Sequence, residues 1–323
     1  MKVRALLLAL GMCLAFAPLS DSNADDPNQW LERMSAAMSQ MNYQGTFVYV
    51  LGDHVETVRI THMVDEKGAH ERLVSVSGMP SEVFRDSDGV RWISGDGGEV
   101  LANATSSRSF FPELPIGSTT EAADSYSFQL ANKQRIAGHS GRQLDIVPRD
   151  QFRYGYRLWL ETQSGLLLKW ELTGVNGETL AKLMFTELKM GSQVDPAELR
   201  PAKSKGTASS GSTTDEKQEI KSRNPASWQA GSLPPGFRLA SHRRQESAEK
   251  SFYEHLVYSD GIAAVSVYIE PAENSPLIDK GLSQWGTTHA FIREVDGMAI
   301  TVLGDVPAAT VQRIGDSVHA VAP

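Results

Sequence analysis

The feature that most constrains this chain is a period of two that repeats from Tyr43 to Leu188. Short runs of alternating apolar and polar residues follow one another, separated by turn sequences such as Gly52-Asp53 and Asp88-Gly89. This alternation is typical of half-buried β-strands, and Gly beside Asp is typical of hairpin turns. Because no long helical pattern interrupts the runs, the sequence predicts one antiparallel sheet that grows by hairpins.

The predicted strands are numerous enough to shape the sheet as a whole. They cover residues 43–51, 55–63, 71–77, 83–86, 90–94, a short piece at 100, 126–130, 134–136, 143–147, 154–161, 166–173 and 179–188. A sheet of about ten strands twists strongly, so it is expected to curl rather than stay flat.

A helix is predicted just before the sheet. Asp26 suits the N-cap position and Pro27 the first helical position. Apolar residues recur there at helical spacing, namely Trp30, Leu31, Met34, Met38 and Met41. This Met-rich face either packs into the core or re-packs around a ligand, since Met is the most adaptable apolar side chain. A curled sheet with a helix across its open side is a half-barrel, whose concave face can enclose a cavity.

The segment DQFRYGYRLWLETQSGLLLKWEL, residues 151–173, is the richest in large side chains. Along its first strand, alternate residues form two sets. One set is Phe152, Tyr154, Tyr156 and Leu158, and the other is Arg153, Gly155, Arg157 and Trp159. Since successive side chains of a strand point to opposite faces, aromatic and cationic residues are predicted on opposite sides of the wall.

A basic stretch overlaps this segment. It contains Lys133, Arg135, Arg142, Arg149, Arg153 and Arg157, against only Asp145 and Asp150. Such a patch suits phosphate or carboxylate recognition, but the same residues could be the solvated outer face of the strands. Phe110-Phe111 lies in a predicted loop and either covers a cavity mouth or packs into the core.

A change of composition divides the chain. Residues 203–227 are small, polar and charged, so they are predicted to form a flexible linker because they cannot bury enough apolar surface to order themselves. The first domain then covers 25–202 and the second 228–323.

The second domain shows its own pattern of hairpins. Asp260-Gly261 and Asp296-Gly297 are predicted hairpin turns, and a closing helix is predicted from Pro307. Three apolar residues of that last segment are expected to face the sheet: Val311, Ile314 and Val318. The pattern predicts a small α+β domain, and the whole chain is therefore assigned to the α+β class.

The N-terminus has the pattern of a secretory signal peptide over residues 1–24. Lys2 and Arg4 precede a short apolar run, and Ser22-Asn23-Ala24 is a small-x-small cleavage site. Cleavage after Ala24 would remove Cys13, the only Cys of the chain, which would leave no thiol for disulfides, catalysis or metal binding. Two alternatives remain open, a retained membrane anchor and a lipoprotein signal at Cys13. The expected location is the periplasm, as a soluble protein.

The search for catalytic motifs finds none. Gly138-His139-Ser140-Gly141 lacks the spacing of a nucleophile elbow, and His70-Glu71 lacks the second His of a zinc protease helix. The net charge of −8 does not favour nucleic-acid binding. We therefore expect no enzyme activity, no cofactor, no metal and no nucleic-acid partner.

Several blocks of the sequence resemble one known family. They are MNYQGTFVYV, HERLVSVSG followed by SEVFRD, RIAGH, PRDQFRYGYRLWLETQSGLLLKWEL, VYSDGIAAVSVYIEP and TVLGDVPAATVQRIGDSV. In this order they are similar to the RseB/MucB proteins, periplasmic negative regulators of the envelope-stress sigma factor. The resemblance covers nearly the whole chain after the signal segment, and the long linker is its one visible departure.

The resemblance implies a fold and partners for each domain. It implies a half-open barrel with a helical lid, like the lipoprotein carriers LolA and LolB, followed by a C-terminal domain that binds the periplasmic part of a MucA/RseA-like anti-sigma factor. That complex would shield the anti-sigma factor from proteolysis, and lipid or lipopolysaccharide would release it. A carrier of lipid or lipoprotein without a signalling partner is the alternative, an enzyme is a distant third, and a homodimer stays open.

Site residues are predicted from the pattern alone. The lipid-pocket candidates are Trp30, Met34, Met38, Phe47, Tyr49, Phe84, Trp92, Phe110, Phe111, Tyr154, Tyr156 and Leu158. The candidates for head-group contacts are Arg149, Arg153 and Arg157. The candidates for partner binding are Tyr258, Tyr268, Glu270 and Trp285 on the C-terminal hairpins, whose edge could accept a strand of the partner.

Overall fold

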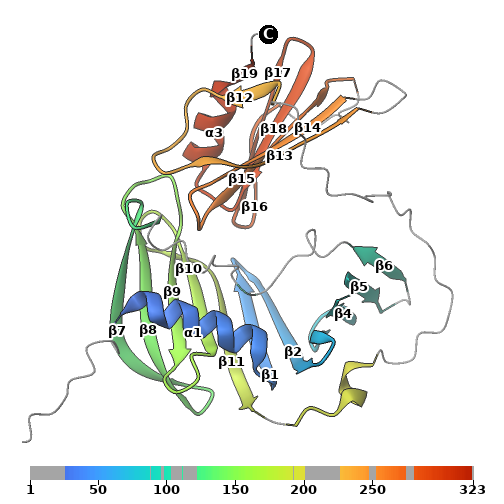
Figure 1. Cartoon of the computed structure of the whole chain (residues 1–323), viewed down its shortest axis with the longest axis vertical. Helices are drawn as coiled ribbons and strands as arrows, with labels where there is room; N and C mark the ends of the chain where they lie inside the picture. Colours follow the sequence, from blue (N-terminus) through green and yellow to red (C-terminus); the bar gives the residue numbers. More distant parts are fainter. Residues whose placement is uncertain are drawn as a thin grey trace, which may run out of the picture.

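The computed structural model describes residues 26–87, 89–95, 98–102, 111, 122–191, 193–200, 226–246, 252–273 and 280–321. The predicted signal segment, nearly all of the predicted linker and Phe110 lie outside these residues. The described chain forms three sheets, an eleven-stranded one in the N-terminal domain and a six-stranded and a two-stranded one in the C-terminal domain (Figure 1). None of the described helices is long and apolar enough to cross a membrane.

The N-terminal domain is one antiparallel sheet with a helix. Its elements are α1 Pro27–Gln40, β1 Tyr43–Leu51, β2 His54–Asp65, β3 Gly68–Ser75, β4 Ser81–Asp86, β5 Gly89–Ser94, β6 Glu99–Ala102, β7 Tyr126–Ile136, β8 His139–Pro148, β9 Gly155–Glu161, β10 Leu167–Thr173, β11 Thr179–Met190 and the 3₁₀ helix η1 Pro196–Leu199. The strand order is β6-β5-β4-β3-β2-β1-β11-β10-β9-β8-β7, so β6 and β7 form the two edges. The sheet does not close, which confirms the predicted open antiparallel architecture.

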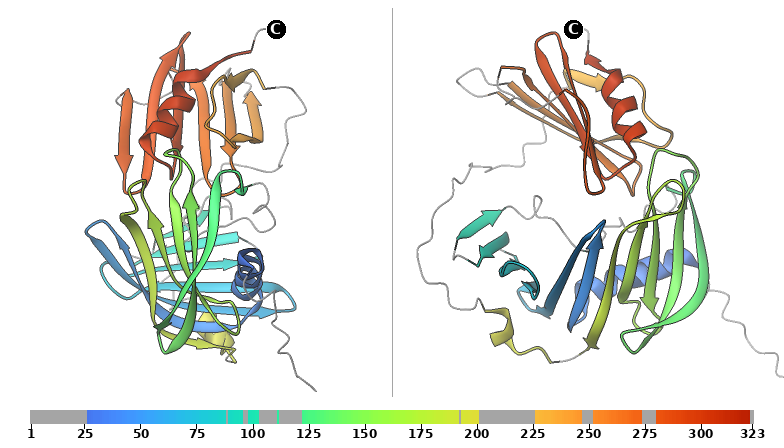
Figure 2. Two further views of the ribbon diagram at one scale, coloured as in Figure 1. Left: turned by 90° about the vertical axis from the view of Figure 1, so that its left-hand side faces the viewer. Right: turned by 180° about the vertical axis from the view of Figure 1, so that it is seen from behind.

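The helix α1 forms where the sequence predicts it. Asp26 is the N-cap and accepts a hydrogen bond from the Asn28 amide, and Pro27 takes the first turn. The buried face consists of Trp30, Leu31, Met34 and Ala37. In Figures 1 and 2 this helix lies across the face of strands β7 to β11, as expected for a helix that covers an open sheet.

Strand register defines the face of the sheet that carries α1, which we call the inner face. Phe47 of β1 lies opposite Phe185 of β11 and Val58 of β2, and all three are at most 1% exposed. Phe111 covers this cluster, with its ring centroid 5.7 Å from that of Phe47 and 6.3 Å from that of Phe185. On β9, Leu158 lies opposite Trp170 of β10 on the same face. The inner face is therefore the core of the domain.

The same register corrects one predicted position. Trp92 pairs with Val83, which pairs with Leu73 of the inner face, so Trp92 is on that face, though 54% exposed. Phe84 is the neighbour of Val83 and points to the opposite, outer face, because successive residues of a strand alternate. There its ring lies 5.6 Å from the guanidinium carbons of both Arg72 and Arg91. Phe84 is therefore not a pocket residue.

The C-terminal domain packs a helix and a two-stranded ribbon on its sheet. Its elements are β12 Trp228–Ala230, β13 Arg238–Glu246, β14 Phe252–Ser259, β15 Ala264–Pro271, β16 Gly281–Trp285, β17 Thr288–Val295, β18 Met298–Gly304, α3 Ala308–Ser317 and β19 Val318–Ala320. The six-stranded sheet has the order β13-β14-β15-β18-β17-β16, and β12 pairs with β19. The two predicted hairpins, β14–β15 and β17–β18, and the closing helix are confirmed.

We expect Phe47→Ala to lower the free energy of unfolding of the N-terminal domain by about 3–5 kcal/mol, because it empties a fully buried ring position. Val55→Ala, at a side chain that is 57% exposed, is the control and should change it by no more than about 0.5 kcal/mol. Urea unfolding followed by circular dichroism measures both. Equal effects of the two substitutions would contradict the placement of the core.

Candidate functional site at the domain interface

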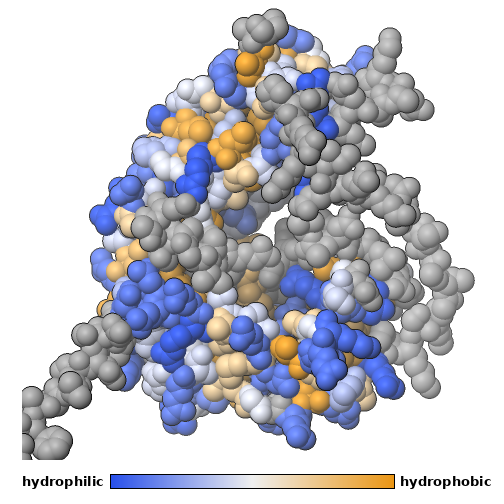
Figure 3. All heavy atoms as spheres, viewed as in Figure 1, coloured by the Kyte–Doolittle hydropathy of each residue, from blue (hydrophilic) through white to orange (hydrophobic). Residues whose placement is uncertain are grey.

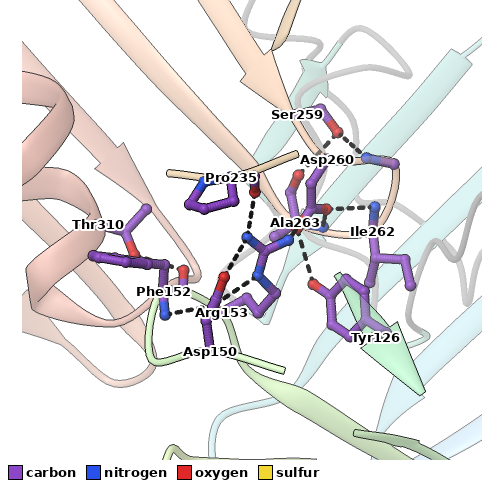
Figure 4. Close-up of polar contacts among 11 residues, drawn as sticks. Tyr126, Asp150, Phe152, Arg153, Pro235, Ser259, Asp260, Ile262, Ala263 and Thr310 are labelled. Atoms are coloured by element: carbon purple, nitrogen blue, oxygen red, sulfur yellow. Dashed lines mark hydrogen bonds and ion pairs between the residues drawn. The ribbon is translucent and has the colours of Figure 1, made fainter. Parts of the chain in front are cut away.

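The loop between β8 and β9 places a charged side chain between the two domains (Figure 4). Oδ1 of Asp150 accepts a hydrogen bond from the Phe152 amide at 2.9 Å, which fixes the loop. Arg153 donates from Nε to the same oxygen and from Nη2 to Oδ2 of Asp150, both at 2.9 Å. Arg153 has no exposed surface. A planar guanidinium is suited to such a buried two-pronged contact.

A second carboxylate comes from the turn between β14 and β15 in the C-terminal domain. Oδ2 of Asp260 accepts hydrogen bonds from Nη1 of Arg153 at 2.5 Å and from the Tyr126 hydroxyl at 3.2 Å. Oδ1 accepts from the amides of Ile262 at 2.9 Å and Ala263 at 2.7 Å. Asp260 is 1% exposed. Because a buried charge is costly unless paired and hydrogen-bonded, these contacts are what allow it to lie there.

A backbone segment before β13 completes the contact. The Pro235 carbonyl accepts a hydrogen bond from Nη2 of Arg153 at 2.6 Å. The guanidinium also lies over two rings, 5.4 Å from the centroid of Tyr126 and 5.2 Å from that of Phe237. Gly236 has a φ of +81°, and a Cβ atom there would lie 2.4 Å from Oγ of Ser125. We call Asp150, Arg153, Asp260, Tyr126 and the Pro235 carbonyl the Arg153 clasp.

Further contacts flank the clasp along the same loop. Oγ1 of Thr310, in α3, donates to the Phe152 carbonyl at 2.6 Å, and the Arg313 guanidinium lies 5.2 Å from the Phe152 ring centroid. The Tyr154 hydroxyl lies 3.3 Å from Nδ1 of His289. Burial, with a contribution from nearby carboxylates, raises the pKa of Tyr154 to about 12, so it is a neutral phenol. The aromatic stretch of this loop is therefore a docking element for the second domain.

Two apolar contacts extend the interface beyond the loop. Ile262, two residues after Asp260 in the β14–β15 turn, packs against the core of the N-terminal domain. Gly286, in the turn between β16 and β17, lies so close to Leu51 of β1 that a Cβ atom would be 2.8 Å from its Cδ2. The two domains thus meet through buried apolar surface as well as through buried charge.

The three head-group candidates have different environments. The head-group role predicted for Arg153 is corrected, because its side chain is enclosed between two carboxylates and is neither at a ligand site nor on a solvated face. Arg157 lies on the outer face, opposite to Tyr156 and Leu158 as predicted, and pairs with Glu171 at 3.2 Å. Arg149 is exposed, and its Nε donates to the carbonyls of Ala123 at 3.3 Å and Tyr126 at 3.2 Å.

Most lipid-pocket candidates lie in or against the inner-face core. Buried there are Trp30, Met34, Phe47, Tyr154 and Leu158, and partly buried are Met38, Tyr49, Phe111 and Tyr156. An open depression of about 470 Å³ lies at the start of α1 and of β7, lined by Pro27, Asn28, Ala123, Tyr126, Ser127, Phe128, Gln129 and Arg149. Of the candidates, only Arg149 lines it. Half of its lining residues are polar, so it differs from the enclosed, mostly apolar pockets that bind small molecules.

The partner-binding candidates are divided between core and surface. Tyr258 is 4% exposed, and its hydroxyl accepts a hydrogen bond from the Ala230 amide at 2.9 Å, so it is a core residue rather than a contact for a partner. Tyr268 is half-buried and stacks on His255 with ring centroids 4.3 Å apart, and Glu270 is half-buried. Trp285 is 62% exposed at the end of the edge strand β16.

The residues that sequence reasoning missed are Asp260, Tyr126 and Pro235. Asp260-Gly261 gave a turn signal that hid the role of the carboxylate, and Tyr126 was predicted only as the start of a strand. In the part of the chain that the structure describes, no group of three or more His, Cys, Asp or Glu side chains is placed to hold a metal ion.

An open antiparallel sheet with a helix across it, joined by a buried charge cluster to a small α+β domain, defines a two-domain protein of the α+β class. Comparison with known proteins gives the family. The chain belongs to the MucB/RseB family, because the family models of the MucB/RseB N-terminal and C-terminal domains match residues 26–203 and 222–319. This confirms the resemblance read from the sequence.

Individual relatives match over almost their full length. The sigma factor AlgU regulatory protein MucB of Pseudomonas aeruginosa is 32% identical, over 99% of this chain and 98% of the relative. The sigma-E factor regulatory protein RseB of Haemophilus influenzae is 23% identical, over 97% of each chain. The solved complex of Pseudomonas aeruginosa MucA and MucB contains a chain that is 30% identical with a TM-score of 0.71, covering 92% of this chain and all of that one.

We expect Arg153→Ala to lower the free energy of unfolding by about 3–5 kcal/mol, because it leaves Asp260 buried without its cationic partner. Arg157→Ala, which breaks an ion pair of a side chain that is 36% exposed, is the matched control and should cost less than about 1 kcal/mol. Denaturant unfolding of the full chain measures both. A double-variant cycle with Asp260→Ala should show strong coupling, and additive effects would contradict the clasp.

Proposed function

We propose that this protein is a periplasmic regulator that binds the periplasmic part of a membrane-spanning anti-sigma factor, shields it from regulated proteolysis and so restrains the sigma factor. The observation that supports this most directly is the full-length match to MucB, a relative described as a sigma factor regulatory protein and solved in complex with MucA. The proposed domains are 25–202 for lipid sensing, 203–227 as linker and 228–323 for partner binding.

The exposed surface of the C-terminal domain supports a role in partner binding. On the face seen in Figure 3, hydrophobic residues form patches on this domain, at the top of the view, among hydrophilic ones. At the edge strand β16, Leu282 is 46% and Trp285 is 62% exposed. An unpaired strand edge with exposed apolar side chains is suited to the addition of an extended peptide.

Release by lipid is the second part of the proposal. Burial of an acyl chain of about 14 carbons is worth on the order of 10 kcal/mol, at ~0.8 kcal/mol per methylene, before losses. Moving an equilibrium from 1:99 to 99:1 requires only about 5.5 kcal/mol of differential affinity. Half of the free energy of burying the acyl chain is therefore sufficient for this shift, provided that the lipid binds one arrangement of the two domains better than the other.

A lipid or lipoprotein carrier without a signalling partner is the alternative function. The clasp favours the regulator, because a carrier needs only the N-terminal sheet and its helix, whereas this chain commits buried charges to holding a second domain. We also propose that residues 1–24 direct export and are removed near Ala24, which places the mature chain in the periplasm.

We expect the mature chain, residues 25–323, to bind the periplasmic fragment of the anti-sigma factor encoded by the same organism and to slow its cleavage by the first regulated protease. The chain 25–202 should bind far more weakly, because it lacks the partner-binding surface. Calorimetric titration and a cleavage time course measure both. Full affinity of 25–202 would contradict the assignment of partner binding to 228–323.

We expect the double substitution Arg149→Ala and Arg157→Ala to weaken release by lipopolysaccharide, while the complex without lipid keeps its affinity. Both side chains are outside the buried charge cluster, and loss of two charge-assisted contacts to head-group phosphates should raise the half-maximal concentration about tenfold or more. Lys133→Ala with Arg135→Ala removes the same charge from β7 and is the control. Identical release curves for the two double variants would exclude the head-group role.

A further inference from the structure

We propose that the free edge of the C-terminal sheet at β13 is a second docking surface, which accepts an extended acidic segment of a partner protein as an added strand. β13 and β16 are the two edges of the six-stranded sheet, so this surface is separate from the one at β16. Its chemistry is also different, because β13 is basic whereas β16 exposes Leu282 and Trp285.

The strand β13 offers a long unpaired row of backbone groups. It has nine residues, Arg238–Glu246, and it pairs with β14 on one side, with no other strand of the described chain on its far side. Residues 238–241 and Arg243 are exposed, so a partner can approach the backbone there. Free N–H and C=O groups at a sheet edge are the template on which an extended peptide adds as a strand.

The charge on this edge is positive. β13 carries Arg238, His242, Arg243 and Arg244, and none of its side chains that the structure describes is acidic. The chain as a whole has a net charge of −8, so the strand differs from it in sign. Neighbouring strands are stabilised by cross-strand pairs of opposite charge and destabilised by pairs of like charge. The edge therefore favours an added strand that is acidic.

Strand register places the two exposed arginines on one face of the sheet. Arg238 pairs with Ser259 of β14, and Arg243 pairs with His255. Leu256, the neighbour of His255, is 0% exposed in the core that includes α3, so His255 and Arg243 lie on the opposite face. A bulge in β13 between the two arginines adds one residue, which keeps both on this face.

The spacing of the two arginines defines the pattern of the added strand. Their partners in β14, Ser259 and His255, are four residues apart, so the arginine side chains are separated by one further position on their face. A regular strand presents residues four apart on the same face. The partner that fits is therefore an extended segment with two acidic residues four positions apart.

The other two cations of β13 already have partners within the domain. Nη1 of Arg244 donates to Oγ of Ser227 at 2.6 Å. Nε2 of His242 lies 2.8 Å from Oε1 of Glu254, a carboxylate with no exposed surface. These contacts hold the middle of β13 on the domain, so the edge is a rigid template for a partner.

Arg243, in contrast, keeps a charge that the domain does not neutralise. It is exposed and makes no ion pair with any residue that the structure describes. Burial, and then the charge of Arg243, lower the pKa of His255, so this neighbouring ring is neutral at neutral pH. The ring stacks on Tyr268 with centroids 4.3 Å apart, which places a flat aromatic surface beside the guanidinium. A carboxylate of an added strand would supply the missing counter-charge.

The same charges exclude a second copy of this chain as the occupant. Two β13 edges brought together would place arginines beside arginines, and like charges across a strand pair are destabilising. Charged side chains at an edge commonly protect a sheet against such self-association. Here they also select between partners, because they attract an acidic strand and repel a basic one.

The experiment measures peptide binding to the mature chain, residues 25–323, by fluorescence anisotropy at about 0.15 M salt. The probes are the fluorescein-labelled peptides TEVTVEVT and TKVTVKVT, which differ only in the charge of two side chains four positions apart. We expect the acidic peptide to bind about tenfold more tightly or better, because an exposed ion pair is worth up to about fivefold and the basic peptide is repelled.

A third probe tests the pairing of the backbones. The peptide TEPPPEVT keeps both acidic side chains at the same spacing, but its three prolines have no amide hydrogen to donate. We expect it to bind about tenfold more weakly than TEVTVEVT, because strand addition depends on main-chain hydrogen bonds.

Two double variants test the position of the surface. Arg238→Glu with Arg243→Glu reverses the charge of the edge and should reverse the preference, so that the basic peptide binds about tenfold more tightly than the acidic one. This gain of binding also shows that the variant is folded. Lys182→Glu with Lys189→Glu makes the same change of charge at exposed residues of β11 and is the control, which should keep the preference for the acidic peptide.

Each probe and variant has a result that contradicts the proposal. Equal binding of the acidic and the basic peptide to the unchanged chain would overturn the acidic partner. The same reversal of preference in the β11 control would show attraction by net charge alone and overturn the assignment to β13. Undiminished binding of the proline peptide would overturn strand addition. No anti-sigma fragment takes part in these measurements, so their outcome is independent of the proposed function.

Discussion

The burial of Arg153 is the constraint on which the arrangement of the two domains depends. A guanidinium without exposed surface requires anionic partners, and its two carboxylates come from different domains, Asp150 from its own loop and Asp260 from the β14–β15 turn. The N-terminal domain alone does not provide acceptors for the whole guanidinium. Without the C-terminal domain, Nη1 of Arg153 loses Asp260 and Nη2 loses the Pro235 carbonyl. Desolvation therefore makes the docked arrangement specific, since a displaced domain would leave one charge buried and unpaired.

The rest of the fold serves to hold this loop in place. Strands β8 and β9 lie inside the eleven-stranded sheet, so the loop between them starts and ends on the rigid core that Leu144 and Leu158 help to form. On the other side, Asp260 is fixed by two amides of its own turn, and Thr310 anchors the Phe152 carbonyl from α3. Both partners of the charge pair are therefore held by rigid supports, one in each domain.

Local sequence patterns predicted most of the helices and strands, but they did not predict contacts between residues that are distant in the sequence. The hairpins, the α1 cap at Asp26 and the closing helix each depend on a few neighbouring residues, and the structure confirms them. Arg153 and Asp260 are 107 residues apart, and nothing in either local pattern indicates that they meet. Phe84 was misplaced because its pocket role was inferred from the sequence pattern alone, whereas the strand register relative to Leu73 decides on which face of the sheet it lies. Strands β12, β13, β16 and β19 were missed because they form through tertiary pairing.

The clasp gives the contact between the domains a defined geometry, and this bears on how the contact can be regulated. All of the Arg153 donors have acceptors only when Asp150 and Asp260 lie on either side of the guanidinium. Another arrangement of the domains would leave at least one of these buried groups without its partner, and that desolvation cost favours the docked arrangement. A ligand or partner protein that binds another arrangement better by a few kcal/mol shifts the population toward it, so an interface whose arrangement depends on one buried charge pair is suited to regulation by differential binding.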